Sequence, residues 1–261
     1  MPNDVILETR DLTMRFGGLM AVSDFSAAIA RGSITGLIGP NGAGKTTCFN
    51  MITGFYRPTS GEVLFEGRPI GGLPAHKVCH AGIARTFQNI RLFGNETVLE
   101  NVMIGRHLRQ KTSWLQTLVF TPASIREDRS MRARCLGLLD VVGLADPAGE
   151  KAASLPYGAQ RRLEIARALA TEPSFLLLDE PAAGMNPQES EDLMGFVRAI
   201  RKDFGLTILL IEHDMKVVMG ICEHIWVLDY GLTIAEGNPE AIRSDPKVIL
   251  AYLGEEDAIH A

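Results

Sequence analysis

The sequence predicts an α/β fold built on a parallel sheet, with a helical segment inserted into the chain. An apolar run at 34–38 leads through a glycine-rich loop into a helix-like segment at 48–52. Two further unbroken apolar runs, at 175–178 and 207–211, are typical of central parallel strands that are covered on both faces. Helical patterns alternate with these runs, as expected when crossover helices join parallel strands.

The other predicted strands lie mostly in the first third of the chain. Residues 6–16 and 22–29 are expected to form the first two strands, the second with rough alternation of apolar and polar residues. A turn at 57–61 precedes a strand at 62–65, and a short strand is expected at 83–87.

Helices are predicted where apolar residues recur at every third or fourth position. These segments are 97–106, 126–142, 158–171, 187–204 and 238–244. The block 89–155 carries helical patterns but no clear strand, and it lies between core strands. We therefore interpret 1–261 as one domain, with an α/β part formed by 1–88 and 156–261 and a helical subdomain formed by 89–155.

Residues 39–47 match the phosphate-binding pattern GxxxxGK followed by Ser or Thr, and they lie between a strand and a helix as the pattern requires. The glycines let backbone N–H groups turn toward an anion, and Lys45 supplies charge for the β- and γ-phosphates. Thr46 places a hydroxyl on Mg²⁺. The residues assigned to the nucleotide here are Gly39, Asn41, Gly42, Ala43, Gly44, Lys45, Thr46 and Thr47.

Two adjacent carboxylates follow the apolar run at 175–178. A buried parallel strand would deliver Asp179 to its carboxyl edge, where open α/β sheets bind ligands. Asp179 can hold Mg²⁺ through water, and Glu180 can polarise the water that attacks the γ-phosphate. A strand followed by an ordinary acidic turn would look the same, but the neighbouring phosphate loop favours the catalytic interpretation.

Composition limits the classes of partner. The net charge is −5 and the sequence pI is about 5.7, so no basic surface indicates nucleic-acid binding. The four cysteines show no CxxC spacing and are expected to be small buried residues of a reducing compartment. They are Cys48, Cys79, Cys135 and Cys222. We expect no signal peptide, and no apolar run approaches the ~20 residues that span a bilayer, so membrane association has to come through partners.

Residues 154–169 resemble the signature segment of the ATP-binding cassette (ABC) ATPases, which is usually Leu-Ser-Gly-Gly-Gln followed by an arginine-bearing helix. Leu155 and Gly158 match that pentapeptide, whereas Pro156, Tyr157 and Ala159 replace its serine, first glycine and glutamine. The resemblance implies that Tyr157 and Gly158 bind the ATP held by a second chain. A helix with a basic solvent-facing surface would explain the arginines alone.

Other positions match the family one by one. Phe16 matches the aromatic residue that stacks on adenine, although core packing would also explain it. Gln88 matches the glutamine that touches Mg²⁺ and the attacking water. His213 matches the switch histidine at the γ-phosphate, and its position after 207–211, interpreted as the last core strand, favours this role over a structural one. Asn186 lies in the inter-subunit loop and also suits a helix N-cap.

The resemblance extends over 7–253 and is closest to the LivG-like ATPases of high-affinity branched-chain amino-acid importers. The stretches that carry it are 14–18, 85–93, 161–167, 180–187, 211–216 and 246–254. It implies a P-loop NTPase (RecA-like) core with an N-terminal antiparallel β subdomain and an inserted helical subdomain. It also implies ATP hydrolysis with Mg²⁺.

The implied partners are a second ABC ATPase subunit, identical or different, and two transmembrane permease subunits. A soluble solute-binding protein would act indirectly, and the chain would lie on the cytoplasmic side of the inner membrane. Apolar Ile90, Leu92 and Phe93 follow Gln88 and are predicted to receive the permease, although interior packing would explain them equally well.

Three alternatives stay open at this stage. The chain could serve an importer of another solute. It could be a catalytically weak regulatory cassette, which the altered signature favours and intact Lys45, Glu180 and His213 oppose. A translation-factor or DNA-repair ABC protein is less consistent, because such chains carry two cassettes or a long coiled-coil insertion.

Overall fold

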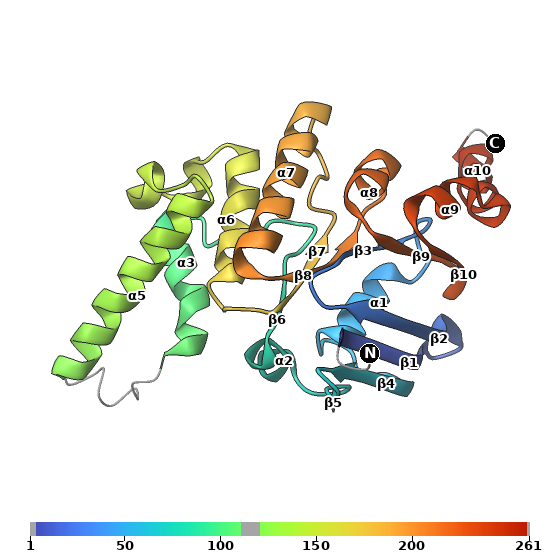
Figure 1. The fold of residues 1–261 in the computed structure, drawn as a ribbon, viewed down its shortest axis with the longest axis horizontal. Coiled ribbons are helices and arrows are strands. Elements are labelled where there is room, and N and C mark those ends of the chain that lie inside the picture. The colour runs from blue at the N-terminus through green and yellow to red at the C-terminus, as the bar shows by residue number, and fades with distance from the viewer. Residues whose placement is uncertain (1–3, 111–120, 260–261) are drawn as a thin grey trace. The chain divides into compact units, whose positions relative to one another are not determined.

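The computed structural model describes residues 4–110 and 121–259, and the chain divides into two compact units (Figure 1). The first unit comprises Met1–Arg85 and Ser174–Ala261 and contains both sheets. The second comprises Thr86–Pro173, and its elements are helical. Residues 111–120, part of the predicted helical subdomain, lie outside the described residues.

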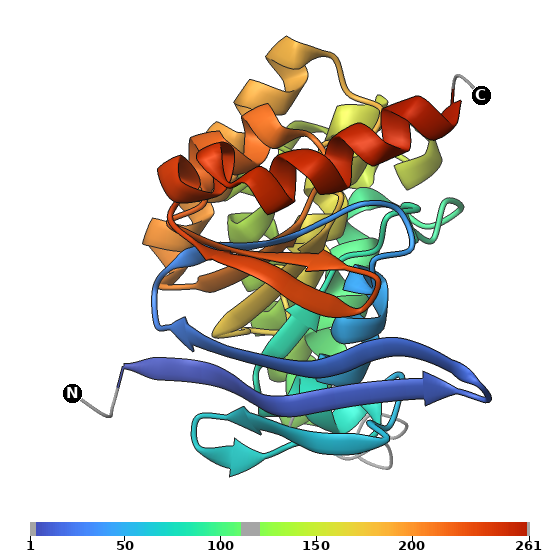
Figure 2. The same ribbon diagram turned by 90° about the vertical axis from the view of Figure 1, so that its right-hand side faces the viewer.

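The first unit contains a four-stranded and a six-stranded sheet. The four-stranded sheet has the order β2-β1-β4-β5. Its strands are β1 (Val5–Phe16), β2 (Leu19–Ala30), β4 (Ser60–Phe65) and β5 (Arg68–Pro69). All its pairings are antiparallel, and Figure 2 shows β1, β2 and β4 side by side.

The six-stranded sheet has the order β10-β9-β3-β8-β7-β6. Its strands are β3 (Ile34–Ile38), β6 (Ile83–Arg85), β7 (Phe175–Asp179), β8 (Thr207–Ile211), β9 (His224–Asp229) and β10 (Leu232–Gly237). Within the described part of the chain, β9 and β10 pair antiparallel and the other neighbouring strands of this sheet pair in parallel. Ile211 lies opposite both Leu37 and Asp179, so the carboxyl ends of β3, β7 and β8 meet at one edge. The loops that follow these three strands therefore converge.

Helix α1 (Lys45–Ile52) packs between the two sheets. Its buried Cys48, Phe49, Met51 and Ile52 belong to one apolar cluster with residues from both sheets, Leu7 and Phe175 among them. Burying this cluster is the main favourable contribution to folding of the unit. It also fixes the loop at the N-terminal end of α1 against the strand edge.

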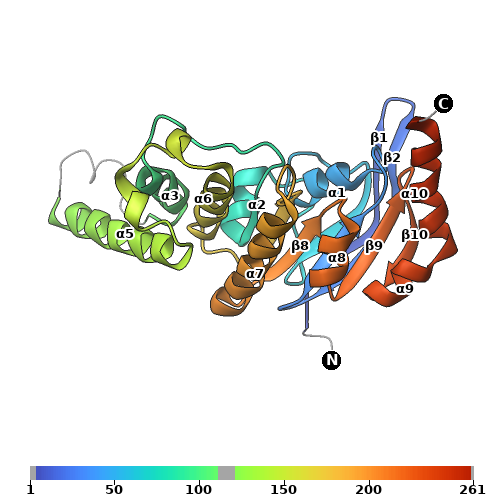
Figure 3. The same ribbon diagram turned by 90° about the horizontal axis from the view of Figure 1, so that it is seen from above.

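The opposite face of the six-stranded sheet is covered by α7 (Pro187–Phe204) and α8 (Met215–Ile221), which lie over the sheet in Figure 3. A Cβ placed on Gly36 of β3 would meet Cys222 Sγ at 3.1 Å and Val218 at 3.4 Å, so α8 approaches the backbone of β3 closely. Helices α2 (Ala75–Ala81), α9 (Pro239–Ser244) and α10 (Pro246–Ile259) complete the unit.

The second unit is built on α3 (Val98–Arg106), α5 (Pro122–Val141) and α6 (Tyr157–Leu169). Helix α3 packs against both of the others. Thr97 and Glu100 form a reciprocal capping box at the start of α3. Short 3₁₀ turns occupy His107–Arg109, Asp146–Gly149 and Ala152–Ser154.

The division between the units differs from the predicted one at both ends. The sequence assigned 86–88 and 156–173 to the α/β part, but the structure groups them with the helical unit. The physical reason is that the buried face of α6 packs on α3 and α5. Residue order alone could not reveal this, because α6 directly precedes a core strand.

Most of the predicted core strands are confirmed, and two predictions need correction. The strand expected at 83–87 ends at Arg85. The prediction that 207–211 is the last core strand is wrong, because β9 follows it and pairs in parallel with β3. Among the described residues, no helix is long and apolar enough to cross a membrane.

Candidate nucleotide site

The predicted phosphate loop joins β3 to α1, and two glycines show how its backbone is shaped. Gly39 has φ of +146°, and a Cβ there would lie 2.0 Å from the carbonyl oxygen of Leu228. Gly42 has φ of +77°, and a Cβ there would meet nothing within 4 Å, so this part of the loop faces open space. The loop is thus packed against β9 on one side and accessible on the other.

Lys45 is the first residue of α1, and its side chain folds back against the loop. Its side chain is buried, and its Nζ donates to the carbonyl oxygens of Gly39 at 2.6 Å and Pro40 at 2.7 Å. No side chain caps the N-terminus of α1, where Gly44 is the N-cap residue. A positive charge, a glycine-rich loop and the N-terminus of a helix therefore lie together, and this combination suits the binding of a polyphosphate. The other loop residues assigned to the nucleotide, Asn41, Ala43, Thr46 and Thr47, lie in the same segment, with Asn41 and Thr46 exposed.

Asp179 ends β7 as predicted, but it has a buried cationic partner that the sequence analysis missed. Arg85 Nη2 lies 2.6 Å from Asp179 Oδ2, and both side chains are almost fully buried. Arg85 also donates to Asn50 Oδ1 at 2.6 Å, and its guanidinium lies 5.4 Å from the centre of the Phe49 ring. The pair thus ties β6 and β7 to α1. An arginine within a short apolar strand was the available signal.

Glu180 and His213 follow adjacent strands and approach each other. His213 Nδ1 lies 3.7 Å from Glu180 Oε2. The backbone N–H of Glu180 donates to Ile211 O at 2.9 Å, which fixes the turn to the end of β8. Glu180 adopts φ of +45°, a conformation that costs energy for a residue with a side chain and is found often at functional sites. Two predicted catalytic residues are therefore neighbours.

Glu212, between β8 and His213, is a second residue that the sequence analysis did not select. Its side chain is 1% exposed. Burial raises the pKa of its carboxyl group, while hydrogen bonds from the backbone N–H groups of Ala182 and His213 act in the opposite direction. Glu212 directly follows Ile211, the last residue of β8, and precedes His213 and Asp214, so in the sequence it looks like part of an acidic turn.

For both Phe16 and Asn186 the sequence left a structural role open beside the functional one. Phe16 ends β1, is 42% exposed and packs edge-on against Tyr56, with ring centroids 5.3 Å apart. Interior packing therefore does not account for it. Asn186 forms a capping box with Glu189 at the start of α7, with Pro187 at the first helical position, which confirms the predicted N-cap.

Gln88, Tyr157 and Gly158 belong to the second unit. There, Arg161 donates to the carbonyl oxygens of Phe87 at 2.8 Å and Gln88 at 2.9 Å, and it pairs with Glu164 at 2.9 Å. Arg161 and Glu164 are both fully buried, so the interpretation of this helix as having a basic solvent-facing surface is wrong for Arg161.

Helix α6 is thus fastened to the segment that carries Gln88. Glu164 Oε1 also lies 3.4 Å from the backbone nitrogens of Phe87 and Arg91. The segment 89–93 is partly accessible. Ile90 and Leu92 are half-buried, whereas Phe93 is 50% exposed beside the guanidinium of Arg167. Interior packing therefore does not explain Phe93.

The signature turn leads into α6 through Pro156, which stands where the usual pattern has serine. Pro156 is the N-cap residue of α6, and no side chain caps this helix. The exposed Tyr157 turns its hydroxyl toward Arg161 Nη2, 3.3 Å away. Gly158 is half-buried in the first turn.

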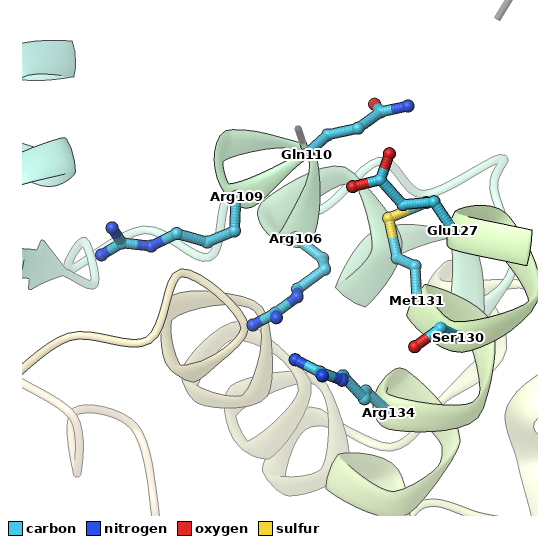
Figure 4. A pocket seen from close by; sticks show the side chains of 7 residues that line it. All are labelled: Arg106, Arg109, Gln110, Glu127, Ser130, Met131 and Arg134. Atoms are coloured by element: carbon cyan, nitrogen blue, oxygen red, sulfur yellow. The ribbon is translucent and has the colours of Figure 1, made fainter. Parts of the chain in front are cut away.

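A separate cavity of about 210 Å³ in the second unit is lined by polar and charged residues and one methionine (Figure 4). They are Arg106, Arg109, Gln110, Glu127, Ser130, Met131 and Arg134. The ends of Arg106 and Arg134 converge there, whereas Arg109 points away. Arg106 pairs with Glu172 at 2.5 Å, and Arg109 donates to Thr171 O at 2.6 Å, just after the end of α6. These charges are therefore used in closing a helix terminus.

Comparison with known proteins decides the family. The ABC transporter family model matches residues 22–183, more than half of the chain. The chain belongs to this family. A second family model, described as branched-chain amino acid ATP-binding cassette transporter, matches residues 233–258 of this chain.

Several curated ABC proteins are similar over nearly their whole length. The high-affinity branched-chain amino acid transport ATP-binding protein BraF of Pseudomonas aeruginosa is 49% identical over 96% of this chain and 98% of its own. LivG of Escherichia coli, described in the same terms, is 47% identical over 96% of this chain and 98% of its own. The probable LivG of Archaeoglobus fulgidus is 36% identical over 97% of each chain.

Solved ABC structures have the same fold. The ADP conformation of MJ1267, an ATP-binding cassette of an ABC transporter, matches with a TM-score of 0.84 at 35% identity, covering 96% of this chain and 99% of that one. A dimeric post-hydrolysis state of the cassette MJ0796 bound to ADP and phosphate matches with a TM-score of 0.74 at 25% identity, covering 90% and 99%. The predicted ABC ATPase fold is thereby confirmed.

Proposed function

We propose that this ABC ATPase is the ATP-hydrolysing subunit of an importer for branched-chain amino acids. The observation that carries the hydrolytic part is the meeting of three loops at one sheet edge. These loops follow β3, β7 and β8 and present Lys45, Glu180 and His213.

In the proposed reaction, backbone N–H groups of 39–44 and the start of α1 hold the β- and γ-phosphates. Lys45 exchanges its two loop carbonyls for phosphate oxygens. Glu180 orients and polarises the attacking water, and His213 contacts the γ-phosphate from the neighbouring loop. Its position 3.7 Å from Glu180 supports this division of roles. Phe16, half exposed at the end of β1, stacks on adenine.

The oxygen donors present suit Mg²⁺, which prefers carboxylate, hydroxyl and water ligands. Thr46 and Asp179 would hold it, with Gln88 as a further contact. When bound, Mg²⁺ would neutralise charge that develops on the phosphates. Arg85 Nη2, which lies 2.6 Å from Asp179 Oδ2, keeps that oxygen of the carboxylate in a fixed position.

The partners follow from the same proposal. Tyr157 and Gly158 would contact ATP held by a second ABC ATPase subunit, identical or different, and the dimeric state of the MJ0796 cassette supports such pairing. Residues 89–93 would receive one of two transmembrane permease subunits, and the exposed Phe93 ring supports this contact. The chain would thus be a peripheral protein on the cytoplasmic face of the inner membrane. A soluble solute-binding protein would deliver solute to the permease and act on this chain only indirectly.

The substrate is inferred from relatives alone. The curated proteins at 47–49% identity are described as subunits of high-affinity branched-chain amino acid transport, and the matching model at 233–258 supports the same solute class. Nothing in the nucleotide site bears on the solute, since ATPase subunits of this type do not contact it.

A catalytically weak regulatory cassette is the second candidate, and Pro156 favours it because the N-cap of α6 lacks a side-chain hydrogen bond. Turnover by the purified chain separates the two. The proposed function requires measurable MgATP hydrolysis, and its absence from both the isolated chain and the reconstituted transporter would favour the regulatory role.

The chemical proposal is tested by Glu180→Gln, which keeps the shape of the side chain but removes the carboxylate. We expect MgATP binding to persist while turnover falls by about two orders of magnitude or more. Lys45→Ala should instead weaken ATP binding directly. Near-normal turnover in Glu180→Gln would exclude the role of Glu180. Affinity purification from native membranes would then identify the permease and the solute-binding protein.

A further inference from the structure

Glu212 joins the two turns that carry Glu180 and His213. Its Oε1 accepts the backbone N–H of Ala182 at 2.8 Å, and its Oε2 accepts that of His213 at 3.2 Å. The first donor lies in the turn after β7 and the second in the turn after β8. One side chain therefore uses both carboxylate oxygens to set the spacing of two neighbouring loops.

The turn after β7 is short and internally bonded, so a hold on Ala182 is also a hold on Glu180. The N–H of Ala183 donates to Glu180 O at 3.2 Å, and the N–H of Met185 donates to Ala182 O at 3.1 Å. At its other end, the N–H of Glu180 is bonded to Ile211 O. A displacement of Glu212 would thus move the backbone on which Glu180 is mounted.

His213 is bonded to the same side chain. Its own side chain is 60% exposed, so packing does little to hold the imidazole beside Glu180. The hydrogen bond from its backbone N–H to Glu212 Oε2 links the start of this turn to a buried side chain. Glu180 and His213 face Glu212 from their two turns, and His213 Nδ1 also lies 3.9 Å from Glu212 Oε2.

The choice of residue is unusual for a purely structural bond. A carboxylate that is 1% exposed is costly to bury, and burial correspondingly raises its pKa. An amide of the same shape would avoid the charge but has only one acceptor oxygen. A carboxylate offers a separate acceptor oxygen to each of the two N–H groups.

We propose that Glu212 is a positioning residue for ATP hydrolysis, which sets the distance between Glu180 and His213 by bonding both of their turns. The inference rests on the proposed function and adds a residue that acts without touching ATP. Misplacing a reacting group by a fraction of an ångström to 1 Å lowers rates by up to about a hundredfold, whereas binding through the separate phosphate loop would be unaffected.

The decisive variant is Glu212→Gln in the full chain. Because the amide NH₂ must face one of the two N–H donors, one bond is lost with no change in side-chain length. We expect kcat to fall roughly tenfold or more, with the KM for MgATP and the affinity for a fluorescent ATP analogue within about twofold of the parent. Glu212→Asp, a shorter side chain with two acceptors, should recover part of kcat.

A triple variant distinguishes positioning from general support. If Glu212 acts through Glu180 and His213, then adding Glu212→Gln to the double variant Glu180→Gln/His213→Ala should lower the residual kcat little further. Glu223→Gln, at a carboxylate that pairs with Arg201 on the surface, is the matched control and should leave kcat unchanged. Multiplicative losses, or parallel losses of thermal stability and ATP affinity with kcat intact, would overturn the proposal.

Glu180→Gln, measured beside these variants, keeps the two proposals separate. Loss of turnover there with a normal kcat in Glu212→Gln would overturn only the positioning role. Normal turnover in Glu180→Gln would overturn the proposed chemistry itself. If Glu212→Gln does not fold, Glu212→Asp decides: an unchanged kcat, KM and melting temperature would exclude dependence on the geometry of this side chain.

Discussion

The N-termini of α1 and α6 are both assigned to phosphate, yet they are built in different ways. Before α1, the loop gets its shape from backbone conformations that favour glycine, with Gly39 tight against Leu228 O. Before α6, the N-cap is Pro156, and the helix is fixed by buried Arg161 and Glu164, which lie further along the same helix. The loop before α1 is therefore shaped by its own residues, whereas the turn before α6 is positioned by side chains of the helix that follows it.

The largest expected effect tests the backbone-built site. Gly39→Ala places a Cβ 2.0 Å from Leu228 O of β9, and this strand cannot move away from the loop without disturbing the sheet. We expect a loss of about 5 kcal/mol or more, which for a chain of this size lowers the melting temperature by roughly 10 °C or more.

Gly42→Ala is the matched control, because its Cβ would meet nothing within 4 Å. The left-handed backbone alone should cost about 1–2 kcal/mol there. Thermal unfolding without nucleotide measures both variants. Equal losses would mean that steric contact with β9 does not shape the loop.

A smaller effect is expected from breaking the buried Arg161–Glu164 pair of α6. Arg161→Met leaves Glu164 buried without its cation, and breaking such a pair costs about 3–4 kcal/mol. It also removes donors to Phe87 and Gln88. Amide hydrogen exchange should therefore accelerate within 87–91 of the second unit.

The neighbouring Arg162→Met variant serves as the control, since Arg162 is only half-buried. Arg161→Met combined with Glu164→Leu should recover much of the stability, because no uncompensated charge then remains in the interior. Protection of 87–91 that is the same in all three variants would show that the pair does not hold this segment.

The same contrast explains what the sequence could predict. The phosphate loop, Asp179, Glu180 and the apolar strands could be predicted because each needs particular residue types at fixed spacing. Strand β9 was missed even though 225–228 is apolar, because His213 was taken to follow the last core strand. Strand β10 shows mixed burial and little periodicity.

Buried polar partners were harder to predict for a physical reason. Arg85, Arg161 and Glu212 act across long sequence separations, and in each case the local pattern is that of an ordinary charged residue. Their burial depends on which elements pack together. The unit boundary was misplaced for the same reason, since the buried face of α6 shows its partner only in three dimensions.

The smallest effect on stability, and the sharpest test of the signature turn, is expected from Pro156→Ser. A serine N-cap adds about 1 kcal/mol through a bond to the first turn of α6, but removing proline frees the unfolded chain by about 0.4–1 kcal/mol. The melting temperature should therefore change little.

In the ATP-bound dimer, the hydroxyl can add one bond to a charged phosphate, worth at most roughly 1.5–3 kcal/mol. ATP-dependent pairing, measured in a Glu180→Gln background, should tighten about tenfold, and turnover with intact Glu180 should rise. Pro156→Ala, which lacks the hydroxyl, should do neither. If Pro156→Ser weakens pairing and turnover together, proline is itself the adapted residue of this turn, and the two helix N-termini differ in construction without differing in strength.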